Sequence, residues 1–258
     1  MLDNSQGADS LGKAAGKGVP LRKLGIIGGT GWTSTALYYE HINRGIGQKL
    51  GGLHSARLAI DSLDFAEYAA LEHAGDWDAA AKMNVDAASR LVASGAEGVL
   101  MACNTSHKCY DQVAASIDVP LLHIADAAAE RLAADRRTNV AVLGTRFTMT
   151  EPFVRSRIEA RGINLVPIEE SWVREVDRII FEELAVGRVV RDSQRSLKTL
   201  ITELAKRKTQ AVLLACTELV FAVDVRANVI PVYDTTAIHA RAAVDWMLAD
   251  QELALAAA

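Results

Sequence analysis

The chain has 258 residues and a formal net charge of -4; half of its residues are apolar and 23% are charged. This composition is typical of a soluble globular protein with a substantial core, and the acidic balance argues against nucleic acid as a partner. No apolar run reaches the roughly 20 residues of a membrane helix, so we expect no membrane association. Three cysteines cannot complete a disulfide framework and suit a reducing cytosol, which predicts a cytoplasmic protein.

The N-terminal residues 1–20 contain no continuous apolar segment of the kind found in signal peptides, and we expect them to form a mobile tail. The first strand is predicted at residues 24–28, before the glycine-rich turn Gly28-Gly29-Thr30-Gly31. The glycine spacing of this turn differs from Gly-x-Gly-x-x-Gly, so binding of a small carboxylate is a better expectation than binding of a nucleotide. A helix is predicted next, over residues 33–49, with one of the hydroxyl residues at 33–35 as its cap.

Helices and strands then alternate through two similar halves of the chain. In the first half they are predicted at residues 57–60, 76–94, 98–101, 106–117, 121–124 and 125–134. In the second half they are predicted at residues 140–145, 152–160, 164–166, 172–185, 193–207, 212–215 and 229–233, with a final helix after residue 234. Gly28 precedes Cys103 by 75 residues, and Gly144 precedes Cys216 by 72, which indicates an internal duplication of an α/β unit.

The duplication predicts a division into two domains. Residues 21–122 together with 231–258 are assigned to the first domain, and residues 123–230 to the second. The last segment is given to the first domain because a swap of the final elements would return the last helix to it.

Two of the three cysteines occupy equivalent places in the two halves. Cys103 and Cys216 each follow an apolar strand and precede a helix, where ligands collect in open α/β sheets. We expect the two thiols to face each other across the cleft between the halves. One cysteine, as a thiolate, then removes a hydrogen from a substrate carbon, while the other delivers a proton to the opposite face and inverts the configuration. The helix N-terminus beside each thiol is expected to lower its pKa.

Polar side chains near the two cysteines predict how a substrate carboxylate is held. The hydroxyl and amide groups concerned are those of Asn104, Thr105, Thr145 and Thr217. The sequence has no Cys-x-x-Cys and no His-Glu-x-x-His, so neither a metal site nor a redox site is predicted.

Two further residues of this region have more than one interpretation. Cys109 is expected to be a packing residue of the core. His107, one turn after Cys103, either tunes the thiol or is a capping or solvent-facing residue.

Several motifs together resemble the aspartate/glutamate racemase family over about residues 24–246. They are Cys103-Asn104-Thr105, Cys216-Thr217-Glu218, the Gly28-Gly29 turn, Leu143-Gly144-Thr145 with Thr148-Met149, and Asp234-Thr235-Thr236 with Ile238-His239-Ala240. The resemblance implies an α/β fold of two flavodoxin-like domains, each a doubly wound parallel sheet, related by pseudo-twofold symmetry with the substrate in the interdomain cleft. It also implies a homodimeric racemase that uses two bases and no cofactor, and therefore no pyridoxal phosphate.

The resemblance also implies roles for single residues. Cys103 and Cys216 correspond to the two acid/base residues. The implied substrate-binding residues are Gly29, Thr30, Asn104, Thr105, Thr145, Thr148, Arg174, Thr217 and Glu218. Arg174 stands where relatives place a cation for an acidic side chain, which predicts aspartate or glutamate as the substrate; an exposed helix arginine is the alternative.

Two departures from the family pattern lie near the expected pocket. Thr30 replaces the methionine of many relatives, and Ala215 replaces the usual glycine before the second cysteine. Both bear on which substrate is bound. They leave the broad reaction unchanged. Three other functions stay open beside the racemase: a maleate-isomerase-like enzyme, a hydantoin-racemase-like enzyme, and a non-catalytic binding protein for an acidic metabolite.

Overall fold

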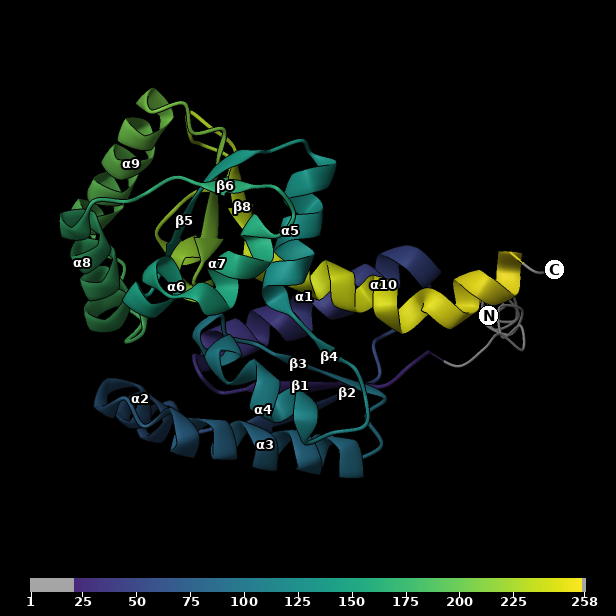
Figure 1. Ribbon diagram of the computed structural model, residues 1–258. Helices are drawn as coiled ribbons and strands as arrows, with labels where there is room; N and C mark the ends of the chain where they lie inside the picture. Colours follow the sequence, from purple (N-terminus) through teal and green to yellow (C-terminus); the bar gives the residue numbers. More distant parts are fainter. Residues whose placement is uncertain (1–20, 257–258) are drawn as a thin grey trace, which may run out of the picture.

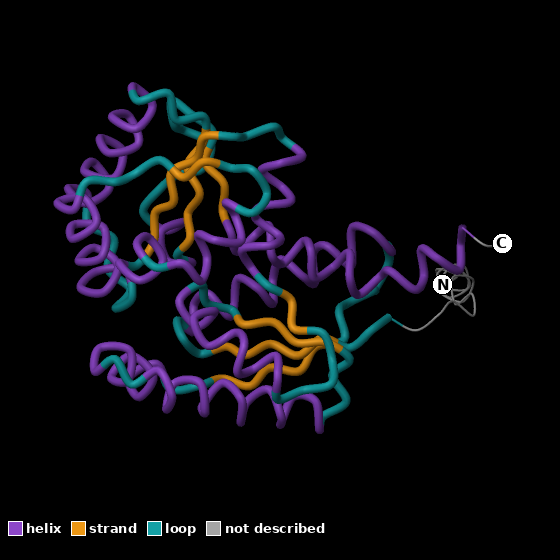
Figure 2. The backbone as a smooth tube through the Cα atoms, in the orientation of Figure 1, coloured by secondary structure: helices purple, strands orange, loops and turns teal. Residues whose placement is uncertain are grey.

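The computed structural model describes residues 21–256, with side chains through residue 250, so the tail predicted at 1–20 lies outside the described residues. The described chain forms two four-stranded parallel sheets of the same strand order, β2-β1-β3-β4 and β6-β5-β7-β8. Figure 1 shows each sheet with its own helices, and Figure 2 shows the strands as two separate groups. The prediction of a duplicated α/β fold with two doubly wound sheets is confirmed.

The first unit is built around the buried strands β1 and β3, whose residues have almost no exposed surface. Apolar residues of α1 cover one face of the sheet, and those of α3 and α4 cover the other. Its elements are β1 (Leu24–Gly28), α1 (Trp32–Leu50), β2 (Leu58–Ser62), α2 (Phe65–Ala74), α3 (Trp77–Ala93), β3 (Gly98–Met101), the 3-10 helix η1 (Thr105–Cys109), α4 (Tyr110–Ala115) and β4 (Leu121–Leu122).

The second unit repeats this plan around β5 and β7, with α5 and α7 on one face and α8, η2 and α9 on the other. Its helices and strands are α5 (Ile124–Ala134), β5 (Asn139–Gly144), α6 (Arg146–Thr150), α7 (Pro152–Glu159), β6 (Asn164–Leu165), α8 (Glu170–Arg178), the π-helix η2 (Ile179–Leu184), α9 (Arg191–Lys206), β7 (Ala211–Ala215), the 3-10 helix η3 (Thr217–Phe221) and β8 (Val232–Asp234). The chain ends in α10 (Thr235–Ala256).

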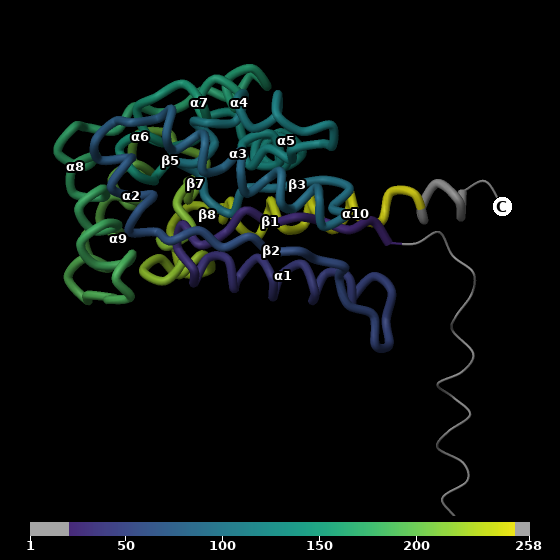
Figure 3. The backbone as a smooth tube through the Cα atoms, turned by 90° about the horizontal axis from the view of Figure 1, so that it is seen from below, coloured from purple at the N-terminus to yellow at the C-terminus, as the bar shows by residue number. Residues whose placement is uncertain are grey.

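The last segment of the chain joins the two units. Strand β8 pairs with β7, with Val232 opposite Val212, and so belongs to the second sheet. The predicted boundary, which gave residues 231–258 to the first domain, is therefore corrected for β8. Helix α10 does return to the first unit, where Ala243 and Val244 pack in one core with Ile42 of α1. Figures 1 and 3 both show α10 running beside α1.

Several predicted elements differ in detail from the structure. Helix α1 begins at Trp32 after its N-cap Gly31, so the predicted caps Thr33, Ser34 and Thr35 lie inside the helix. The Thr35 oxygen instead accepts a hydrogen bond from the Gly29 N–H. The helix predicted at 106–117 is a 3-10 turn followed by a short α-helix. The helix predicted at 172–185 changes into a π-helix after residue 178.

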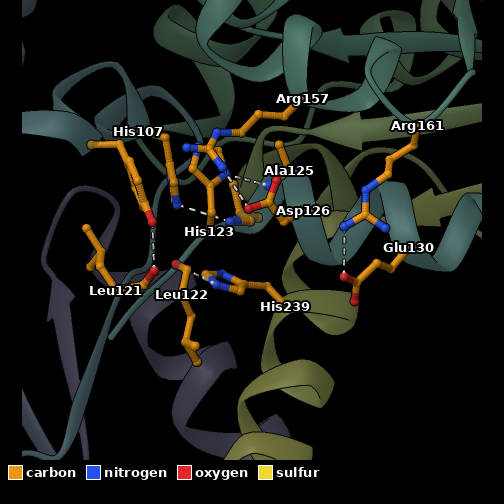
Figure 4. Close-up of polar contacts among 12 residues, drawn as sticks. His107, Leu121, Leu122, His123, Ala125, Asp126, Glu130, Arg157, Arg161 and His239 are labelled. Carbon is orange, nitrogen blue, oxygen red and sulfur yellow. Dashed lines mark hydrogen bonds and ion pairs between the residues drawn. The ribbon is translucent and has the colours of Figure 1, made fainter. Parts of the chain in front are cut away.

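Three buried histidines hold the connection between the units, as Figure 4 shows. The Nδ1–H of His107 donates to the Cys103 carbonyl at 2.8 Å, while its Nε2 accepts from the Ile124 N–H. His239 of α10 donates to the Leu122 carbonyl and accepts from the Tyr38 hydroxyl, and His123 caps α5. Burial lowers the pKa of His107 to about 4 and that of His239 to about 3, so both rings are neutral at pH 7.

Candidate active site

A small closed cavity lies between the two units, beyond the carboxyl ends of β3 and β7. Its volume is about 20 Å³, the space of about one water molecule. An amino acid cannot enter this volume, so binding requires the units to move apart. The lining residues are Thr30, Phe65, Glu72, Cys103, Asn104, Thr105, Thr145, Ile180, Phe181, Ala185, Cys216, Thr217 and Glu218. A larger groove of about 660 Å³, between α5 and α10, contains neither cysteine.

The cavity brings together both predicted acid/base cysteines and six of the nine predicted substrate-binding residues. The six are Thr30, Asn104, Thr105, Thr145, Thr217 and Glu218. Thr148 does not line the cavity but lies directly behind it, with its hydroxyl 3.1 Å from that of Thr145.

Arg174 is not at the cavity. Its side chain is 64% exposed on α8 and forms an ion pair with Glu170, one turn earlier on the same helix. The exposed-helix alternative therefore describes Arg174 in this structure, and the predicted cation for an acidic side chain is not supplied by this residue. None of the lining residues is a lysine, an arginine or a histidine.

The glycines of the glycine-rich turn serve packing, whereas Thr30 between them lines the cavity. Gly29 does not line the cavity; its φ is 88°, and a Cβ there would lie 2.0 Å from the Leu63 carbonyl oxygen. Gly31 has φ 87°, and a Cβ there would lie 2.1 Å from Oε1 of Glu218. Glycine at position 31 therefore allows a carboxylate of the second unit to approach the backbone of the first.

The Glu218 carboxylate organises the second cysteine. Its Oε2 accepts hydrogen bonds from the Cys216 thiol at 3.1 Å and from the Thr217 hydroxyl at 2.8 Å. Its Oε1 accepts a hydrogen bond at 2.9 Å from Ser34, which belongs to the first unit. The thiol of Cys216 is thereby oriented and held as a protonated donor.

Both thiol pKa values are raised in this closed structure, which corrects the expectation that they are lowered. Burial, with the charges of Glu72 and Glu218, raises the pKa of Cys103 to about 11. Burial and the adjacent Glu218 raise the pKa of Cys216 well above its usual range. The helices after the cysteines are short 3-10 turns, so their N-termini have little dipole with which to oppose burial.

A row of hydroxyls runs across the cavity wall from one unit to the other. The Thr105 hydroxyl lies 3.0 Å from that of Thr145, which in turn contacts Thr148. Asn104 donates from its amide nitrogen to Thr235 at 3.1 Å, while its buried Oδ1 has no hydrogen-bond partner. The wall therefore offers hydroxyl donors for a carboxylate and a free oxygen acceptor for an ammonium group.

Two other predicted roles are decided by burial. His107 is 1% exposed and bonds to the backbone of Cys103, so it positions the turn that carries the thiol and does not face solvent. Cys109 is fully buried in a hydrophobic cluster of the first unit, as expected of a packing residue.

The structure adds five lining residues that the sequence did not single out. Glu72 and Phe65 come from α2, a helix that was not predicted; Ile180 and Phe181 come from the π-helix η2, and Ala185 directly follows it. Asp64 caps α2 and is followed three residues later by Glu67, a spacing typical of helix starts that would have predicted this helix.

Contacts of α2 and α3 with the second unit close the cleft. His73 packs edge-on against Phe181 with 5.1 Å between ring centroids, and Trp77 packs in the same way against Phe147. Lys108 forms a 2.6 Å ion pair with Glu151 and lies over the Trp77 ring. These contacts hold the cavity shut in this structure.

No group of three or more His, Cys, Asp or Glu side chains in the described part of the chain is arranged to hold a metal ion. Among the described helices, none is both long and apolar enough to cross a bilayer.

Comparison with known proteins places the chain in a family. The family model for Asp/Glu/hydantoin racemases matches residues 27–243. The broad specificity amino-acid racemase RacX of Bacillus subtilis is 25% identical over 88% of this chain and 99% of its own length. Two solved structures each match 88% of this chain over 99% of their own length. One is a Yersinia pestis protein assigned to the Asp/Glu racemases, with 40% identity and TM-score 0.81; the other is an aspartate racemase homologue from Pyrococcus horikoshii, with 31% identity and TM-score 0.75. The chain therefore belongs to the Asp/Glu/hydantoin racemase family.

Proposed function

We propose that the protein is a cofactor-independent amino-acid racemase in which Cys103 and Cys216 act as the two acid/base residues. The observation that supports this most is the equivalent position of the two cysteines, each after the central strand of a repeated unit, in the lining of one closed cavity. Thiols that approach one carbon from two units are suited to proton transfer on opposite faces.

The reaction transfers two protons. One cysteine, as a thiolate, takes the proton from Cα, and the electron pair of the C–H bond moves into the substrate carboxylate. The other cysteine donates its thiol proton to the opposite face of Cα and becomes the thiolate. The product has the inverted configuration, and the two cysteines have exchanged protonation states.

The polar wall of the cavity supports a pose for the substrate. The hydroxyls of Thr105 and Thr145 are donors for the carboxylate, where negative charge builds as Cα loses its proton, while the Thr217 hydroxyl already donates to Glu218. The unpartnered Oδ1 of Asn104 is an acceptor for the α-ammonium group. Thr148 positions Thr145 from behind.

Substrate binding must also activate a thiol, because burial and carboxylate charges favour the protonated form in the closed, empty site. An α-ammonium group brings positive charge next to the cysteines and lowers their pKa values. Glu218, which already accepts a hydrogen bond from Cys216, is the group placed to take its proton. The thiolate is thus expected to form only when substrate is bound.

The charge of the substrate side chain does not follow from the two cysteines. The sequence predicted aspartate or glutamate, but Arg174 lies outside the cavity, and two carboxylates line it. The relative from Bacillus subtilis is named a broad specificity racemase, so the full set of amino acids is the appropriate test panel. We also propose that the protein is a homodimer that works without pyridoxal phosphate, as the family resemblance implied, and that it is cytoplasmic, as its cysteine content predicted.

Solvent exchange tests the proposal. The purified protein, dialysed against a carbonyl-trapping reagent that removes pyridoxal phosphate, is incubated in deuterium oxide with each L-amino acid. We expect deuterium at Cα together with the D enantiomer, detected by chiral chromatography and mass spectrometry. If no amino acid exchanges its Cα hydrogen, the racemase proposal is refuted. An inactive protein that is stabilised by an acidic ligand then supports a binding role. A covalent adduct on a cysteine supports a maleate-isomerase-like reaction.

A further inference from the structure

Glu72 is a buried carboxylate at the cavity whose function the reaction does not explain. It is 3% exposed, it lines the cavity with both cysteines, and its Oε1 has no hydrogen-bond partner. Burying a carboxylate oxygen without a partner is costly, so a group outside the described residues is expected to complete it.

The other carboxylate of the cavity is already satisfied. Glu218 accepts hydrogen bonds from Ser34, Cys216 and Thr217. Among the residues that the structure describes, none donates to the Glu72 carboxylate, and neither a lysine nor an arginine lines the cavity to balance its charge. The cavity is therefore negative overall, with one carboxylate oxygen free to accept.

The surroundings of Glu72 suit a long side chain with a charged end. Phe65 lies on the same helix, and Ile180, Phe181 and Ala185 line the cavity from the second unit. These apolar groups can pack against methylenes, as protein interiors do with the stems of lysine and arginine. The hydroxyls and the Asn104 oxygen that suit the α-carboxylate and α-ammonium groups line the same cavity.

We propose that Glu72 determines substrate specificity by binding a positively charged side chain, so that the preferred substrates are basic amino acids such as lysine, ornithine and arginine. This inference rests on the proposed racemase function and names the substrate class of the same site. A basic substrate side chain takes the place of the acidic one that was predicted from Arg174.

The electrostatics of Glu72 agree with this assignment. Burial, together with the charges of Glu218 and Asp177, raises the pKa of Glu72 to about 7. A cation beside the carboxylate offsets both burial and the neighbouring charges, because an opposite charge lowers the pKa of a carboxyl and favours its ionised form. The same carboxylates repel an aspartate or glutamate side chain.

Two other uses of Glu72 make different predictions. If Glu72 binds the α-ammonium group, which every amino acid carries, its loss weakens all substrates alike. If Glu72 is protonated and donates to an acidic side chain, glutamine at position 72 preserves that donor. Substrate pairs that differ only in the side-chain charge separate these cases.

The experiment measures kcat/KM for racemisation of L-lysine, of the uncharged L-norleucine, which has the same carbon chain, and of L-glutamate. For the natural protein we expect lysine to be preferred. In Glu72→Gln the ratio of kcat/KM for lysine to that for norleucine should fall roughly 10- to 100-fold, the range of a hydrogen bond to a charged group. Glu67→Gln, the same change at an exposed position of α2, should leave the ratio and both rates unchanged.

Two outcomes overturn the inference. Either the natural protein prefers norleucine or glutamate to lysine, or Glu72→Gln leaves the ratio of kcat/KM for lysine to that for norleucine unchanged, whether or not all rates fall equally. Each of them leaves the racemase proposal intact, since exchange is still observed. Exchange with no amino acid at all refutes the racemase proposal itself. Circular dichroism of Glu72→Gln and its residual rate on norleucine show that the variant is folded.

Discussion

The hydroxyl of Ser34 donates a 2.9 Å hydrogen bond to the Glu218 carboxylate, joining residues 184 positions apart from the two units of the fold. The same carboxylate holds the thiol of Cys216, so the second proposed acid/base residue is oriented in part by the first unit. This arrangement exists only while the units are closed. Closure therefore assembles the site as well as excluding water from it.

Replacing either cysteine of the cavity should stop racemisation. Cys103→Ser and Cys216→Ser each remove one of the two acid/base groups, and we expect a loss of roughly 10²- to 10⁴-fold in kcat. Each variant should still exchange the Cα hydrogen of only one enantiomer, measured by deuterium incorporation into separate L and D substrates. Cys109→Ala is the matched control and should keep its activity, because Cys109 packs in the core. Full activity in both serine variants would refute the two-base assignment.

Removing the charge of Glu218 should make Cys216 more acidic. Burial is the main cause of the raised pKa of Cys216, and Glu218 adds to it by charge and by accepting the thiol hydrogen. In a Cys103→Ser background, Glu218→Gln should shift the pH profile of Cys216 alkylation to lower pH. The variant Glu67→Gln in the same background controls for a general change of charge. An unshifted profile would contradict the role assigned to the carboxylate.

A side chain at position 31 should be tolerated much less than one at position 162. Both glycines have positive φ, 87° and 75°, but a Cβ at Gly31 meets Glu218, whereas a Cβ at Gly162 has no atom within 4 Å. We expect Gly162→Ala to cost roughly 1 kcal/mol of unfolding free energy and Gly31→Ala about 1–3 kcal/mol more, measured by urea denaturation. Gly31→Ala should also lower activity. Equal costs would argue against the closed contact with Glu218.

The free protein should gain stability when Glu72 becomes neutral. A carboxyl whose pKa is about 7 in the folded protein and about 4.5 when unfolded destabilises the fold increasingly as pH rises from 4.5 to 7. Glu72→Gln should therefore unfold at higher urea concentration at pH 8, with a gain of about 1–3 kcal/mol. Such a gain, combined with lost preference for lysine, is the pattern of a residue kept for function. A destabilised variant would mean that the Glu72 carboxylate has partners in solution.

Acid should destabilise the protein through its buried histidines. The pKa of His107 is about 4 and that of His239 about 3, while an unfolded histidine has a pKa of about 6.5. The unfolded chain thus binds more protons below pH 6.5, and stability falls as pH drops from 6.5 toward 4. For His107 alone the loss reaches about 3 kcal/mol.

Glu72 opposes this loss over part of the same range, because its protonation on acidification favours the fold. The measurement is therefore best made in Glu72→Gln, by urea denaturation at pH 6.5, 5.5 and 4.5. The exposed His54 serves as the control: His54→Asn in that background should leave the slope unchanged. A free energy of unfolding that stays constant between pH 6.5 and 4.5 would contradict the assigned neutral state of the histidines.

The sequence by itself determined the repeated α/β plan and the pairing of Cys103 with Cys216. Buried parallel strands are short apolar runs, and the residues that follow them meet at one edge of the sheet, so both features depend on local pattern and spacing. The neighbouring Asn104, Thr105, Thr145 and Thr217 could be predicted for the same reason.

Only the tertiary structure decided the charge of the cavity and the state of its thiols. Glu72 reaches the site from a helix between two strands, and no local pattern in the sequence tells which face of that helix meets the cleft. The position of Arg174 outside the cavity, on the exposed face of α8, could not be predicted for the same reason. Thiol pKa values depend on burial and on carboxylates far apart in the sequence, which packing alone brings together. Position after a strand can be deduced from a sequence, whereas desolvation and charge environment are properties of the folded chain.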